Sequence, residues 1–104
     1  MKRIVIKLEY KCFPMWIYDD AILLKNDLID DLRADTTIDE SLTDIQNTYD
    51  ALFIDDGIEF CYKGFSSEKE KTIFKRAIEN ATEYIESKGG DRYIIDQEID
   101  FDKI

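Results

Sequence analysis

Carboxylates are the residues of this sequence whose type and spacing could do chemistry. Asp27, Asp30 and Asp31 lie within one turn of each other if their segment is helical, so two of them could share a Mg²⁺ ion. A nuclease built on such a site also needs cations that hold the phosphate, and only Lys25 and Arg33 are nearby. The sequence has no histidine, which removes the usual Ser–His and Cys–His nucleophile pairs. We therefore expect neither an enzyme nor a bound cofactor or metal, and a small carboxylate–metal enzyme is the least favoured alternative.

The acids are concentrated in one continuous third of the chain. The 104 residues carry a net charge of −10, and residues 19–59 hold thirteen carboxylates against two cations, a net charge of −11. Residues 1–18 carry +3 and residues 60–104 carry −2. Charges held this close together repel each other and oppose the compact state. We interpret the acidic third as a surface that meets a positively charged partner, because nucleic acid and anionic lipid would both be repelled.

Five segments that could position these acids have the pattern of β-strands, with alternating charged and apolar residues or runs of β-branched and aromatic residues. Asp19 and Asp20 are expected to turn the chain between the second and third segments. A turn at 55–57 precedes the fourth, and 26–33 is expected to hold a short helical turn. The five predicted strands are residues 2–9, 12–18, 21–25, 58–65 and 91–96.

Two longer segments, 37–53 and 67–88, have the apolar spacing of amphipathic helices. Each begins with the pattern of a capping box, Thr37 with Glu40 and Ser67 with Glu70. Gly89-Gly90 is expected to end the second helix in a left-handed conformation. The apolar stripe of the first helix consists of Ile38, Leu42, Ile45, Tyr49 and Leu52.

This order of elements predicts one α+β domain over residues 1–104. We expect an antiparallel or mixed sheet of about four to five strands, with the two main helices packed on it. The sequence shows no signal peptide and no apolar run that could span a membrane, which favours a cytoplasmic location. Cys12 and Cys61 are expected to be two buried free thiols, with a disulfide as the alternative if the strands bring them together.

The aromatic strand at 12–18 offers two candidate contact residues. Trp16 and Tyr18 alternate with Met15 and Ile17, so one pair faces the core and the other lies on the opposite face. Trp16 is expected in the core, or alternatively as the anchor of an interface, where Trp and Tyr are enriched. The full set of candidate partner-binding residues is Trp16, Tyr18, Asp19, Asp20, Asp27, Asp30, Asp31, Asp35, Asp39 and Asp44.

Three motifs together resemble a known group of proteins. Residues 12–19 (CFPMWIYD) follow the predicted first strand, 26–28 (NDL) come next, and the first long helix ends in 49–53 (YDALF). Over about residues 1–55 the chain resembles the small acidic immunity proteins encoded beside bacterial contact-dependent and other polymorphic toxins. The resemblance implies a cytoplasmic protein that neutralises a cognate, basic, nuclease-type toxin domain by occluding it. A mimic of DNA that inhibits a DNA-binding enzyme is the alternative, because rows of carboxylates can imitate phosphates.

Overall fold

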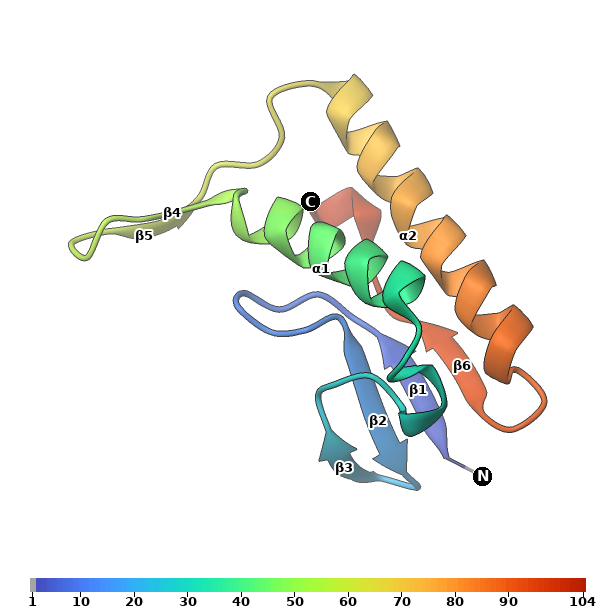
Figure 1. The fold of residues 1–104 in the computed structure, drawn as a ribbon. Coiled ribbons are helices and arrows are strands. Elements are labelled where there is room, and N and C mark those ends of the chain that lie inside the picture. The colour runs from blue at the N-terminus through green and yellow to red at the C-terminus, as the bar shows by residue number, and fades with distance from the viewer. Residues whose placement is uncertain (1) are drawn as a thin grey trace.

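A four-stranded sheet forms the centre of the molecule in the computed structural model, which describes residues 2–104 apart from the side chain of Lys103. The strands lie in the order β3-β2-β1-β6 (Figure 1). β3 pairs antiparallel to β2, and β2 pairs antiparallel to β1. Because β6 pairs parallel to β1, the sheet is mixed. The strands are β1 (Arg3–Ile6), β2 (Met15–Asp19), β3 (Ile22–Lys25) and β6 (Ile94–Gln97).

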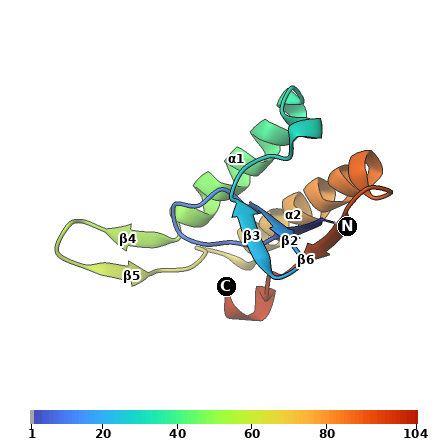
Figure 2. The same ribbon diagram turned by 90° about the horizontal axis from the view of Figure 1, so that it is seen from below.

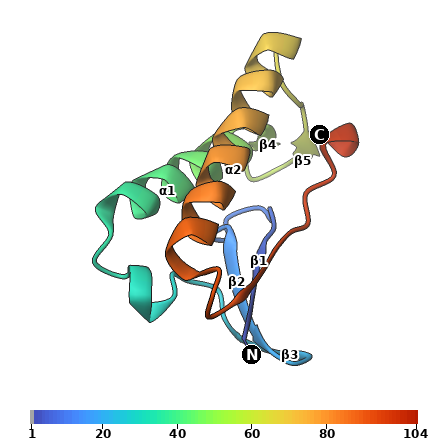
Figure 3. The same cartoon turned by 90° about the vertical axis from the view of Figure 1, so that its right-hand side faces the viewer.

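Two helices, α1 (Thr36–Asp50) and α2 (Glu68–Gly89), cover one face of this sheet (Figures 1 and 3). Their apolar stripes meet the inward residues of β1 and β2 in one core, as the spacing in the sequence predicts. Short 3-10 helices, η1 (Asp30–Leu32) and η2 (Phe101–Lys103), lie before α1 and after β6. The α+β class, the mixed sheet and the two helices on one face are therefore confirmed. The fully buried side chains of the core include Ile4, Ile6, Met15, Ile38, Leu42, Ile78 and Ile85.

The start of α1 differs from the sequence prediction. Asp35, and not Thr37, is the N-cap, because its backbone is extended and its carboxylate Oδ1 accepts a 3.2 Å hydrogen bond from the N–H of Ile38. In α2 the predicted cap is confirmed, since Ser67 Oγ accepts from the N–H of Glu70 at 3.2 Å. The Glu70 side chain does not close the box on the Ser67 backbone and instead accepts a 2.5 Å hydrogen bond from the Ser66 hydroxyl.

The end of α2 also differs from the prediction. Gly90 is right-handed, with φ −64°, so no left-handed cap forms. Glycine at position 90 is instead favoured by steric fit, because a Cβ atom there would lie 2.6 Å from the carbonyl oxygen of Glu86. The chain leaves the helix through a turn in which the N–H groups of Arg92 and Tyr93 donate to the Gly89 carbonyl, both at 3.0 Å. This turn brings the chain to β6.

Between the two helices the chain forms a hairpin that the sequence prediction placed only in part. β4 (Phe53–Asp55) and β5 (Phe60–Tyr62) pair antiparallel as a separate two-stranded sheet. The sequence prediction placed Phe53 at the end of the first long helix, but Phe53 begins β4. It also predicted one strand over residues 58–65 as part of the main sheet, whereas only Phe60–Tyr62 form a strand, and that strand pairs with β4. The hairpin extends past the C-terminal end of α1, away from the main sheet (Figures 1 and 2).

The β1–β2 loop is fastened to α1 by a buried amide. Gln46 Nε2 donates to the Glu9 carbonyl at 3.0 Å and to Asp50 Oδ1 at 2.7 Å. The same Asp50 oxygen accepts the backbone N–H of Lys11 at 2.8 Å, where the chain turns with φ 61°. The loop carries Tyr10 to the base of the hairpin, so these bonds also help to position the hairpin.

Candidate functional site

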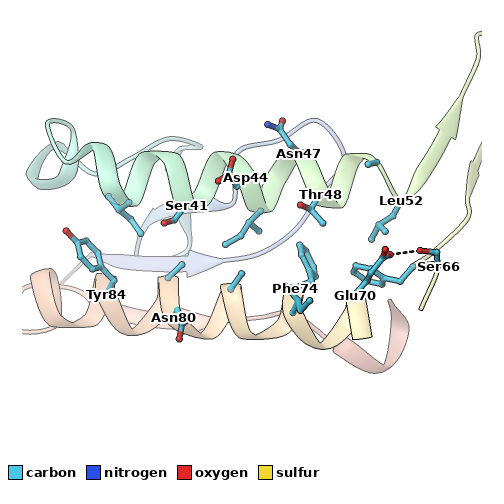
Figure 4. A pocket seen from close by; sticks show the side chains of 18 of the residues that line it. Ser41, Asp44, Asn47, Thr48, Leu52, Ser66, Glu70, Phe74, Asn80 and Tyr84 are labelled. Carbon is cyan, nitrogen blue, oxygen red and sulfur yellow. Dashed lines mark hydrogen bonds between the residues drawn. The ribbon is translucent and has the colours of Figure 1, made fainter. Parts of the chain in front are cut away.

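A groove with a volume of about 1080 Å³ lies between α1 and α2. Figure 4 shows Ser41 and Thr48 pointing from α1 toward α2, and Phe74 and Tyr84 pointing from α2 toward α1. The lining is mainly apolar, with hydroxyl and amide groups at its edges. Such a concave surface is suited to accept apolar side chains of a ligand or partner. Its apolar lining comprises Ile38, Ile45, Ala51, Leu52, Phe65, Ile73, Phe74, Ala77 and Ala81.

Carboxylates lie along the α1 side of the groove. Asp44 lines it, and Glu40 precedes Asp44 by one helical turn, so the two side chains lie on the same side of α1. Both residues are exposed, and neither forms an ion pair within residues 2–102. No cation of these residues therefore lies within ion-pair distance of either carboxylate, although Lys63 also lines the groove. We name Glu40 and Asp44, together with the groove residues, the groove face.

One end of the groove is closed by a hydrogen bond between the helices. The Tyr84 hydroxyl of α2 donates to Asp35 Oδ2 at 2.5 Å, while the other oxygen of Asp35 caps α1. This bond from Tyr84 is the main cause that lowers the pKa of Asp35 below its usual value, with the backbone N–H groups at the helix start adding to it. The same bond raises the pKa of the Tyr84 phenol. Both shifts favour the ionised carboxylate and the neutral phenol.

Among the predicted contact residues, the three near η1 are neutralised locally. Asp27 and Asp30 both pair with Arg33, at 3.6 and 3.4 Å, and Asp30 also pairs with Lys25 at 3.2 Å. The hydrogen bond from Lys25 is the largest cause of the lowered pKa of Asp30. Asp31 pairs with Arg92 in the turn between α2 and β6, far away in the sequence. We name the region around these three aspartates the η1 corner. Its carboxylates are consecutive or nearly so in the sequence, but each forms an ion pair with a cation in the folded structure.

The remaining predicted contact residues lie on different faces. Asp19 and Asp20 lie at the turn between β2 and β3, low in Figure 1, away from the groove and from the β4–β5 hairpin. Trp16 and Tyr18 lie on the sheet face opposite the helices, because Met15 and Ile17 fill the core. Only Asp44 of the ten lines the groove, while Asp35 lies at its end and Asp39 is exposed on another side of α1. The acidic third is thus divided among the β2–β3 turn, the η1 corner, α1 and the tip of the β4–β5 hairpin.

Trp16 is buried even though it faces away from the helices. Its indole N–H donates to the Lys7 carbonyl at 3.1 Å, and the Lys7 ammonium lies 4.7 Å from its ring centre. With 9% of its surface exposed, it is part of the folded interior. The sequence prediction that preferred a buried Trp16 is consistent with this position. Tyr18 is half-buried, with the Arg3 guanidinium 5.6 Å from its ring centre.

Sequence reasoning missed the α2 side of the groove. Ile73 and Ala77 are exposed and line the groove. The signal that could have identified Ile73 is its position in the helical pattern, since it lies outside the stripe that contains Phe74 and Ile78. A single exposed isoleucine is ordinary, but Ile73 and Ala77 continue the apolar lining of the groove, and a contiguous apolar surface indicates a contact site.

Neither cysteine of the chain lines the groove. Across residues 2–102, no three side chains of His, Cys, Asp or Glu are grouped closely enough to hold a metal ion. Both cysteines are free, Cys12 half-buried and Cys61 exposed on β5, so the expected burial of Cys61 is wrong. Within the part of the chain that the structure describes, no helix combines the length and apolar character needed to cross a bilayer.

The fold and the groove define an α+β protein with an apolar, acid-rimmed surface between its two helices. Comparison with known protein families finds no family model that matches the chain, and no curated protein matches it. The function must therefore be argued from the geometry of this chain itself.

Proposed function

We propose that this protein is an immunity protein that binds a basic bacterial toxin domain through the groove face and neutralises it by occlusion. The observation that supports the proposal most is the position of Glu40 and Asp44, unpaired and exposed, beside an apolar groove. Protein interfaces gain most of their affinity from a few desolvated apolar anchors, and charged rims mainly raise the association rate. The groove face offers both an apolar surface for such anchors and carboxylates at its rim.

The charge of the chain supports a basic partner. The net charge of −10 is strong for 104 residues, and it includes acids that have no cation beside them. Complementary charge raises association rate constants from about 10⁵–10⁶ toward about 10⁸–10⁹ M⁻¹s⁻¹ at low salt. Rapid capture suits a protein that must block a toxin before the toxin acts. A toxin that cleaves nucleic acid needs a basic surface to hold phosphates, which makes it a suitable partner.

The alternative of a DNA mimic receives less support. Imitation of a duplex requires carboxylates in rows spaced like phosphates, with one charge per about 1.7 Å of duplex axis. In this fold the acids lie in four separate places, and Asp27, Asp30 and Asp31 are paired with Lys25, Arg33 and Arg92. The arrangement is closer to a protein interface than to a phosphate row.

The direct test mixes the purified protein with the toxin domain encoded in the neighbouring reading frame. We expect one-to-one binding, loss of toxin activity and an association rate that falls steeply as salt is raised. The matched pair of variants is Ile73→Ser on the groove face and Ile22→Ser on the edge strand β3. Both isoleucines are well exposed, 60% and 69%, so neither change should unfold the protein.

Only the Ile73 variant should weaken binding and protection from the toxin. Equal binding by both variants would remove the groove face from the interface. A toxin domain that neither binds the wild-type protein nor loses activity in its presence would overturn the proposal as a whole.

A further inference from the structure

The β4–β5 hairpin is an exposed arm that displays several large apolar side chains to solvent. Ile58 at its tip is 93% exposed, and Phe60 on β5 is 56% exposed. Ile54 and Tyr62 are each 42% exposed. A monomeric protein gains nothing by displaying so many large apolar side chains on one short segment. Figures 1 and 2 show the arm extending away from the rest of the molecule.

The base of the arm is held firmly by aromatic contacts. The Phe53 ring stacks on Phe60 with centroids 5.3 Å apart and an interplanar angle of 8°. It also meets Tyr62 at 5.1 Å, Tyr49 of α1 at 5.2 Å and Tyr10 of the β1–β2 loop at 4.9 Å. An isolated two-stranded hairpin is marginally stable at best in water. These ring contacts tie the arm to α1 and give it a defined direction.

The tip of the arm is organised by Asp56. Its Oδ1 accepts the backbone N–H groups of Ile58 at 3.0 Å and Glu59 at 2.7 Å, and its own N–H donates to the Glu59 carbonyl at 3.2 Å. These backbone bonds lower the pKa of the Asp56 carboxyl, so it is ionised at neutral pH. Gly57 takes the left-handed conformation, with φ 84°, that the turn requires. These bonds order the turn, which exposes the Ile58 side chain.

The arm is also uniformly acidic. Residues 53–62 hold Asp55, Asp56 and Glu59 and no cation. Two copies of the arm would repel each other, and an anionic lipid surface would repel it as well. Charge complementarity thus selects a basic partner, and the convex shape with an apolar tip selects a concave site on that partner.

We propose that the β4–β5 hairpin inserts into a basic cleft of the partner protein. Ile58 is the apolar anchor, and the carboxylates of Asp55 and Glu59 beside it contact the basic groups around the cleft. This inference rests on the proposed function and names the element that occludes the toxin. Insertion of a pre-ordered turn costs little conformational entropy, which favours affinity. The groove face then contacts the surface around the cleft.

The test uses the toxin domain from the neighbouring reading frame and three forms of the full chain: wild type, Ile58→Ser and Ile22→Ser. Ile58→Ser should raise the Kd by about tenfold or more, mainly through faster dissociation, whereas Ile22→Ser should not. Because Ile22 and Ile58 are both exposed, unchanged circular dichroism and Tm serve as the folding control. The double variant Asp55→Asn/Glu59→Gln should slow association and flatten its salt dependence, and the control is Glu79→Gln/Glu83→Gln on the far side of α2.

Cys61 provides a second readout inside the arm. Its thiol is exposed, so a thiol reagent should modify it readily in the free protein and slowly in the complex, in a Cys12→Ser background. If the wild type binds but Ile58→Ser binds equally well, or Cys61 stays fully reactive in the complex, the arm does not insert and only this inference is overturned. If the wild type does not bind the toxin domain at all, the proposed function fails and this inference fails with it.

Discussion

The hydroxyl of Tyr84 donates a 2.5 Å hydrogen bond to Oδ2 of Asp35, and thereby links the C-terminal part of α2 to the residue that caps the start of α1. One carboxylate performs two tasks, because its other oxygen caps the helix through the N–H of Ile38. The bond fixes the two helices together at one end of the groove.

Removal of this bond should lower stability without destroying the fold. Tyr84→Phe keeps the ring and deletes only the donor, so we expect a Tm a few degrees below that of the wild type. Asp35→Ala removes both the bond and the cap and should lower the Tm further. A double-mutant cycle with thermal unfolding measures the coupling between the two side chains. Additive effects of the two changes would contradict the link.

The pH dependence of stability follows from the same pair. The lowered pKa of Asp35 means that its contribution is present above the ordinary aspartate value of about 3.9 and is lost as pH falls through the folded pKa. The raised pKa of Tyr84 means that its contribution is present below about pH 10 and is lost as pH rises through the folded pKa. Urea unfolding of the wild type and Tyr84→Phe across this range should show the difference between them shrink at both extremes.

The two isoleucines of α2 that differ in burial should respond differently to truncation. Ile78 is fully buried in the core, so Ile78→Ala should lower the free energy of unfolding by about 2–5 kcal/mol. Ile73 is 60% exposed, and Ile73→Ala should change it by no more than about 0.5 kcal/mol. Chemical denaturation measures both values. A large loss for Ile73→Ala would mean that the Ile73 side chain is itself part of the core and is not available to a partner.

Charge reversal should separate the groove face from the rest of the surface. Glu40→Lys/Asp44→Lys should slow association with a basic partner by about tenfold or more at low salt, because steering by complementary charge is worth that much. Glu79→Lys/Glu83→Lys changes the net charge equally on the side of α2 away from the groove. Stopped-flow association at several salt concentrations compares the two variants. If both slow association equally, the net charge matters and its position does not.

The paired acids of the η1 corner should matter less for binding. Asp27, Asp30 and Asp31 already face Lys25, Arg33 and Arg92, so a partner meets little uncompensated charge there. Arg92→Gln should change stability by less than about 1 kcal/mol, since the pair is partly exposed. In the same variant, association with a basic partner should become slightly faster, because one more acid is left unpaired. A marked slowing would instead indicate that Arg92 itself contacts the partner.

The helices and their apolar faces could be predicted because the necessary information lies within a few turns of chain. Ser67 caps α2 as expected, and Ile38, Leu42 and Ile45 are buried at the predicted spacing. The α+β class and the turns at Asp19-Asp20 and Asp55-Asp56 follow from equally local patterns. The concentration of acid in residues 19–59 is likewise a property of the sequence alone.

Tertiary structure decided the features that join distant residues. Asp35 replaces Thr37 as the cap of α1, where it also bonds Tyr84, a residue 49 positions away in the sequence. The parallel pairing of β6 with β1 and the separation of β4–β5 from the main sheet depend on how the helices pack, which no local pattern encodes. The acidic third is divided by the same packing: Arg92 reaches Asp31, whereas Glu40 and Asp44 stay unpaired beside the groove. The sequence by itself determined how much negative charge the protein carries, and the packing of α1 and α2 determined where that charge is free to act.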